Sequence, residues 1–165
     1  MKNSLAKVTF REKILNAQDE MKEAISDGKL RDVMDECTLT HYFTPISEDY
    51  GCAVYGREIF LPKGTAIIGK IHRHQHLNII SKGKVSVMTE HGKKYMTAPC
   101  TFISETGLKR AVYAEEDTIW TTIHLTNTPG EDHLQEIEDE VIAPDYKSIG
   151  LIDDIAEYNR LEVIT

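Results

Sequence analysis

Histidines gather in one short part of the sequence, the stretch from Gly64 to Gly83. Three of the seven, His72, His74 and His76, are spaced two residues apart. On a straight β-strand, side chains at this spacing point to the same face, and imidazole is a common metal ligand. The spacing therefore predicts a metal site, provided that a strand runs straight through these residues. The alternative is the solvent-facing side of an antiparallel strand, where polar residues also alternate.

The elements that position these histidines are expected to be strands. From Thr38 onward the sequence consists of short runs rich in β-branched and aromatic residues, separated by turn residues such as Lys63–Gly64 and Lys82–Gly83. Such runs recur at roughly the 8–12-residue spacing that is typical of an antiparallel sandwich or barrel. The sequence therefore predicts a mainly β fold, with the sheet region over residues 39–128.

An N-terminal helical segment, residues 1–38, is expected before the sheets. Apolar residues fall at helical spacing over residues 9–26, and again over residues 29–37. Gly28 separates the two stretches. We therefore predict two helices that pack on the core or on a partner subunit.

The C-terminal segment, residues 129–165, is acidic. It holds far more Asp and Glu than Lys and Arg, so that the rest of the chain is close to neutral, although the net charge of the whole chain is −8. Helices are expected before Pro144 and over residues 151–161. A segment of this kind is usually a solvated covering element. Docking onto a partner is the alternative.

Composition excludes several classes of protein. A chain of 165 residues with 41% hydrophobic content is a single soluble domain by these measures. No run approaches the ~18 apolar residues of a membrane span, and no secretory signal is visible at the start. The negative charge argues against general nucleic-acid binding. Three cysteines without metal-type spacing suit a reducing compartment, so a cytoplasmic protein is expected.

The residues from Tyr55 to Leu125 resemble the cupin superfamily. The first cupin motif, G-x5-H-x-H-x3,4-E-x6-G, matches the spacing from Gly64 to Gly83, and Gly107 retains part of the second motif, P-x-G-x2-H-x3-N. Stretches such as YGREIFLPKGT also resemble small cupin-type proteins encoded by tailed phages. The resemblance implies an RmlC-like, double-stranded jelly-roll β-barrel with N-terminal helices and an acidic, partly helical C-terminal segment.

The resemblance also locates a pocket. The cupin metal ligands His, His, Glu and His correspond here to Lys70, His72, His76 and Arg110. Neither Lys⁺ nor Arg⁺ can bind a cation, whereas the fork of Arg and the point charge of Lys suit an anion. We therefore expect a metal-free pocket in the barrel for a small anionic ligand, such as a nucleotide or a sugar phosphate.

Two other functions stay open. In the first, the protein is a metal-dependent cupin enzyme, such as a dioxygenase or an isomerase. One divalent transition metal is then bound by His72, His76 and a third ligand from His74 or His124, two residues that would otherwise line the anion pocket. In the second, Arg110 pairs with a nearby acid, and the barrel is only the scaffold of a phage structural or interaction protein. Because cupin-like barrels commonly pair, a homodimer is expected.

Overall fold

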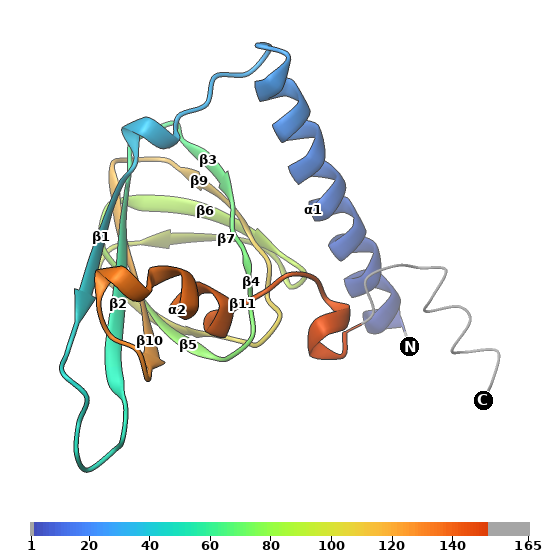
Figure 1. Ribbon diagram of the computed structural model, residues 1–165. Helices are drawn as coiled ribbons and strands as arrows, with labels where there is room; N and C mark the ends of the chain where they lie inside the picture. Colours follow the sequence, from blue (N-terminus) through green and yellow to red (C-terminus); the bar gives the residue numbers. More distant parts are fainter. Residues whose placement is uncertain (1, 152–165) are drawn as a thin grey trace, which may run out of the picture.

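The computed structural model describes residues 2–151. Within them, a five-stranded and a four-stranded antiparallel sheet face each other, a two-stranded sheet is also present, and one long helix lies beside the sheets (Figure 1). The mainly β, jelly-roll fold class predicted from the sequence is confirmed. Its details follow from which strands pair.

The strands that pair are mostly far apart in the sequence. The larger sheet has the order β1-β2-β10-β5-β8, with β1 at Thr38–Phe43, β2 at Ala53–Leu61, β10 at Thr118–Thr126, β5 at His76–Lys82 and β8 at Cys100–Ser104. The smaller sheet has the order β3-β9-β6-β7, with β3 at Ala66–Ile68, β9 at Ala111–Ala114, β6 at Lys84–Thr89 and β7 at Gly92–Thr97. Two sheets built from such non-consecutive pairs are the pattern of a jelly roll.

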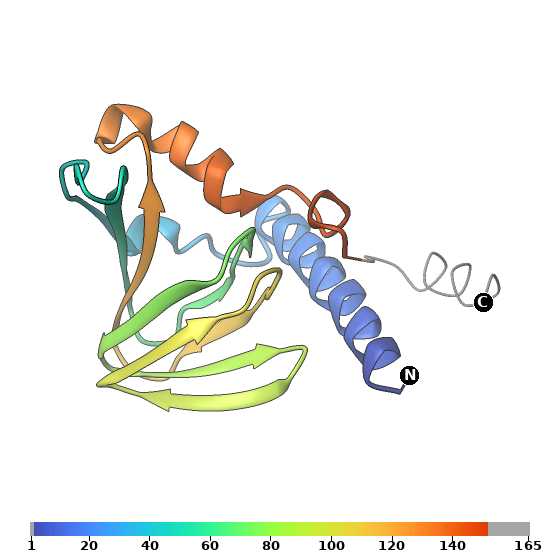
Figure 2. The same cartoon turned by 90° about the horizontal axis from the view of Figure 1, so that it is seen from below.

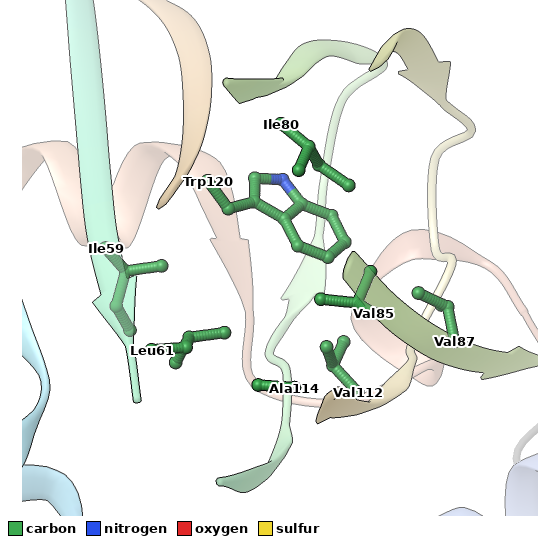
Figure 3. Packing of buried hydrophobic residues seen from close by; sticks show 8 residues of the cluster. All are labelled: Ile59, Leu61, Ile80, Val85, Val87, Val112, Ala114 and Trp120. Atoms are coloured by element: carbon green, nitrogen blue, oxygen red, sulfur yellow. The ribbon is translucent and has the colours of Figure 1, made fainter. Parts of the chain in front are cut away.

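The main hydrophobic core fills the space between the two sheets (Figure 3). Ile59, Leu61 and Trp120 come from the larger sheet, and Val85 and Val112 face them from the smaller one. These side chains sit at alternate positions of their strands, because successive residues of a strand point to opposite faces. Alternation along β10 therefore directs Trp120 toward the interior, together with every second residue after it.

The acidic helix predicted after the sheets is present. Helix α2 (Leu134–Val141) follows the short helical turn η2 (Glu131–His133), and β11 (Ile142–Ala143) ends it by pairing with β4 (Ile71–His72). Ile137 and Val141 are buried and pack against Tyr55. Figures 1 and 2 show α2 lying across the opening between the sheets. The helix predicted over residues 151–161 lies outside the described residues, apart from Leu151.

The N-terminal segment forms one helix rather than two. Helix α1 (Lys2–Ser26) begins earlier than the apolar pattern indicated, and the predicted second helix is reduced to the short turn η1 (Met34–Glu36). Leu30 and Met34 are 45% and 46% exposed, so the second stretch buries too little surface to stabilise so short a helix. No helix in residues 2–151 has the length and apolar character needed to cross a membrane.

Helix α1 is attached by a mixture of apolar and ionic contacts. Ile14 is buried, and Nε of Arg11 forms an ion pair with Glu90 at 2.8 Å. The guanidinium of Arg11 also lies 4.9 Å from the ring centre of Tyr146. A short turn, η3 (Lys147–Ile149), follows Tyr146. Arg11 therefore links α1 to the end of the described chain, and Leu15 of α1 packs against the same apolar cluster as Tyr146.

Gly83 makes the turn between β5 and β6 possible. Its φ of 87° lies in the left-handed region, which side chains with a Cβ rarely adopt. A Cβ atom there would also lie 2.3 Å from the backbone oxygen of Asp117. Gly64 has a similar φ of 88°, but no atom lies within 4 Å of the position that a Cβ would take there. Gly64 and Gly83, at the two ends of the histidine stretch, thus differ in how strongly the structure requires glycine.

Candidate metal centre

A cavity of about 550 Å³ lies between the sheets and beneath α2. Five of the six residues predicted to bind a ligand line it: Lys70, His72, His76, Arg110 and His124. The sixth, His74, is exposed to solvent and is not part of the lining. The structure therefore brings together residues from the histidine stretch, from the turn before β9 and from β10.

His74 is separated from its neighbours because the chain turns between β4 and β5. Residues 73–75 belong to no strand, and two hydrogen bonds to the end of α2 and to β11 hold the turn. The backbone N–H of Arg73 donates to the oxygen of Val141 at 2.8 Å, and its Nε donates to the oxygen of Ile142 at 2.9 Å. The condition of a straight strand is therefore not met, yet His72 and His76 still converge.

Three imidazoles meet in the cavity. The ring centres of His72 and His76 are 4.1 Å apart, and His124 lies 5.2 Å from the first and 4.7 Å from the second. One ring nitrogen of each residue lies within 4.8 Å of those of the other two. One ion could reach all three after small side-chain rotations.

Each histidine is positioned by a different strand. His72 lies on β4 opposite Ile142, His76 begins β5 opposite Ser104, and His124 lies on β10 opposite Tyr55. Alternation from Trp120 places His124 inside. His124 is buried and lines the cavity together with Trp120, which confirms that it lies on the inner face of β10.

Hydrogen bonding assigns the proton of His76. Its Nδ1 lies 3.2 Å from the backbone oxygen of His74. Because a carbonyl oxygen only accepts, Nδ1 must carry the hydrogen, which leaves the lone pair on Nε2. That Nε2 is buried without a hydrogen-bond partner, and so is Nδ1 of His72. A ring held by a backbone carbonyl, with its other nitrogen free, is the usual arrangement of a metal-binding histidine.

Burial keeps these imidazoles neutral. Loss of solvent lowers the pKa of His72 to about 2, with further contributions from His76 and His124. The same loss of solvent lowers the pKa of His124 to about 4 and also lowers the pKa of His76. A neutral imidazole has a free lone pair, which a metal ion requires. The cluster is therefore in its ligand form at neutral pH.

Arg110 lies on the cavity wall near the histidines. It is 8% exposed, it donates from Nη2 to Oγ of Ser104, and its guanidinium lies 5.4 Å from the ring centre of Trp120. Asn78 completes the network, because it donates to Ser104 at 2.9 Å and accepts from Nε1 of Trp120 at 3.0 Å. These contacts fix the direction of the guanidinium.

Arg110 has no acid partner within residues 2–151. Glu105 pairs instead with His91, at 3.3 Å, and Glu58 accepts hydrogen bonds from Tyr42 and Thr121. Lys70 does have such a partner, since its ammonium pairs with Glu138 of α2. The ion pair on which a purely structural role of Arg110 would depend is therefore not formed among these residues.

Sequence reasoning did not single out several residues that line the cavity. Tyr55 and Arg57 lie on β2, and the hydroxyl of Tyr55 is 2.8 Å from Nδ1 of His41 on β1. The alternation of side chains along the strand could have identified them, because residues 55, 57, 59 and 61 point to the same face. Since Ile59 and Leu61 are apolar, that face is the inner one, and an arginine two residues earlier must enter the cavity.

Comparisons with known proteins identify no family from the sequence. No family model matches it, and no curated protein does either. Solved structures do resemble it. KdgF from Halomonas sp. shares 15% identity, with 62% of this chain and 87% of that chain covered and a TM-score of 0.46. An RmlC-like cupin from Shewanella frigidimarina shares 15% identity over 58% of this chain and 89% of that chain, with a TM-score of 0.40.

A third similar structure is a mutant of salicylate 1,2-dioxygenase from Pseudoaminobacter salicylatoxidans. It shares 12% identity over 76% of this chain and 35% of that chain, with a TM-score of 0.48. At such identities the likeness concerns the fold alone, so the activity of these proteins is not transferred. The resemblance to phage-encoded cupins stays a prediction.

Proposed function

We propose that this protein is a metal-dependent enzyme whose centre is one divalent transition-metal ion bound by His72, His76 and His124. One observation carries the proposal: in this cluster, Nδ1 of His72 and Nε2 of His76 are buried without a hydrogen-bond partner. An unpaired polar atom in the interior costs about 1–3 kcal/mol. Coordination of a metal would offset that cost at both atoms.

The donor set indicates which metals fit. Three neutral imidazoles suit zinc, iron, nickel or copper, whereas calcium and magnesium prefer oxygen ligands. Three protein ligands also leave coordination positions open, as in catalytic rather than structural sites. His124 supplies the third ligand that the sequence required but could not assign.

The metal-free anion pocket expected from the sequence has weaker support. That function relied on the charges of Lys70 and Arg110, and protonated histidines would add to them. Lys70 is paired with Glu138, and burial keeps the histidines neutral. Arg110 alone retains the assigned role.

The chain's own residues set the conditions for chemistry. A bound metal would supply Lewis acidity, and redox activity in the case of iron. The cavity walls and α2 bury His76 and His124, and electrostatic interactions are stronger in such a less polar environment. Tyr55, hydrogen-bonded to His41, stacks against His124 with ring centres 6.2 Å apart and holds that ring in place.

Metal content tests the proposal directly. The protein is purified without a histidine tag or chelating resin, and bound metals are measured by elemental mass spectrometry. We expect about one equivalent of a transition metal per chain, after reconstitution if necessary. The dissociation constant of Zn²⁺ is then measured for His124→Gln and for the matched variant His74→Gln.

The two variants show whether the metal binds to the three-histidine cluster or to His74 in the turn. Loss of a direct ligand should weaken binding by more than the roughly 10–100-fold that loss of an outer-shell partner costs, whereas His74→Gln should bind like the parent protein. No transition metal, even after incubation with these ions, would contradict the proposal. Equal effects of the two substitutions would also contradict it.

A further inference from the structure

Arg110 is a buried positive charge without a carboxylate partner among the described residues. Its guanidinium is nine-tenths buried, yet its partners among the described residues are a hydroxyl and two aromatic rings, of Trp120 and Phe102, rather than a carboxylate. Burial lowers the pKa of Arg110 only to about 10, so the group is charged at neutral pH. A buried charge is normally paired, because desolvation of an isolated ion is costly.

A second guanidinium increases the positive charge of the cavity. Arg57 lines the same cavity and forms no ion pair in the part of the chain that the structure describes. Glu138 is the acidic residue of the lining, and Lys70 neutralises it. Among residues 2–151, no acid therefore balances the charge of the two arginines. Three neutral histidine ligands would leave the full charge of a metal unbalanced as well.

Much of the remaining lining is apolar. Its polar members, such as Asn78 and Thr122, form hydrogen bonds within the protein. Ile59, Leu61, Val112 and Trp120 border the cavity beyond the histidines, together with Ile67. Side chains of this kind favour a ligand that carries hydrocarbon surface, because burial of that surface is favourable and these residues offer no partner for hydroxyl groups. The cavity is thus cationic near Arg110 and has an apolar wall formed by Ile59, Leu61 and Val112.

We infer that the cavity takes a small organic carboxylate, whose acid group pairs with Arg110 and whose hydrocarbon body lies against Ile59, Leu61 and Val112. A planar carboxylate matches the fork of a guanidinium in two hydrogen bonds. A sugar phosphate or nucleotide, the anions expected from the sequence, would place hydroxyl-rich surface against the apolar wall. The inference rests on the proposed function in one respect, that this acid is the substrate of the metal site.

The only tryptophan provides a direct probe, because the ring of Trp120 lies against Arg110 within the cavity. Metal-free protein, prepared with a chelator, is titrated with benzoate and with hexanoate while tryptophan emission is recorded, and calorimetry measures the same dissociation constants. The neutral isosteres benzamide and hexanamide are titrated in parallel, as are phenyl phosphate and glucose 6-phosphate. We expect each acid to bind at least about tenfold more tightly than its amide, and more tightly than glucose 6-phosphate.

Two substitutions assign the effect to Arg110. Arg110→Met keeps a long apolar stem but removes the charge, and it should weaken acid binding at least about tenfold while leaving amide binding unchanged. Arg110→Lys keeps the charge without the fork and should bind the acids with intermediate affinity. Arg31→Met removes an exposed arginine paired with Glu36 and should bind like the parent. Thermal unfolding confirms that each variant is folded.

Equal binding of acids and amides would overturn the inference, as would unchanged acid binding in Arg110→Met. Absence of saturable binding up to tens of millimolar would overturn it too. Because the titration uses metal-free protein, its outcome is independent of the metal measurement. A protein that binds metal but no acid contradicts only this inference, and one that binds acid but no metal contradicts only the proposed enzyme.

Discussion

Lys109, next to Arg110 in the sequence, is also a buried cation. It is 5% exposed, and its ammonium donates to the backbone oxygen of Gly69 at 2.8 Å. Burial lowers the pKa of Lys109 from 10.5 to about 8, and the charge of Lys22 contributes. The folded protein thus favours the neutral form of the Lys109 side chain more than water does.

Stability should rise with pH through the window in which Lys109 loses its proton. Between pH 8 and 10.5 the unfolded chain holds this proton more often than the folded one, so the free energy of unfolding increases with pH there. Urea denaturation across this window should show a rise for the parent protein that is smaller in Lys109→Met. Lys13→Met, at an exposed position of α1, should keep the full rise; an identical pH dependence of all three would contradict this account.

Single residues also show how much of the site could be predicted from the sequence. The motif spacing identified His72 and His76, because glycines mark the ends of a fixed length of chain. Alternation on a straight strand placed His74 beside them, but residues 73–75 form a turn and His74 does not line the cavity. Alternation along β2 could have identified Arg57 as a cavity residue. The ion pair of Lys70 could not be predicted in this way, because its partner lies on α2, far away in the sequence.

Helix α2 is held over the cavity by two kinds of contact. Ile137 is 1% exposed and packs with Tyr55 and Val141. The ion pair between Lys70 and Glu138 is about half exposed, with side-chain exposures of 57% and 47%. Exposed pairs contribute about 0–1 kcal/mol, whereas a buried isoleucine contributes several times more.

Substitutions on α2 should reflect this difference. Ile137→Ala is expected to lower the free energy of unfolding by about 2–5 kcal/mol, and Lys70→Met by less than about 1 kcal/mol. Chemical denaturation of both variants measures the difference. A larger loss from Lys70→Met would mean that the ion pair, and not apolar packing, secures the roof of the cavity.

At the level of elements, strands were predicted better than helices. Turn residues recur at regular intervals and mark strand ends locally, so the sequence alone is enough to locate the β region. The second N-terminal helix was wrong because an apolar pattern does not say how much surface is available to cover it. Leu30 and Met34 stay 45% and 46% exposed. Helix α2 was predictable because Pro144 follows it.

For the whole molecule, a homodimer stays a proposal. It comes from the resemblance to cupins and from apolar surface outside the core, where Ile103 and Leu125 are 67% and 66% exposed. Light scattering at micromolar concentration measures the mass in solution. A mass near twice 18.7 kDa supports the dimer, and a mass near that of one chain contradicts it.

Gly83 has a consequence for how this sequence can diverge. The position tolerates no side chain, because φ is positive and the oxygen of Asp117 occupies the place of a Cβ. At Gly64 the surrounding space is open, so asparagine, which adopts left-handed backbone most readily after glycine, is an acceptable replacement there. In a saturation library selected for folded protein, position 83 should retain glycine alone while position 64 also admits asparagine. Sequences that diverge from this chain would then lose Gly64 before Gly83. Motif searches that require both glycines would miss such sequences.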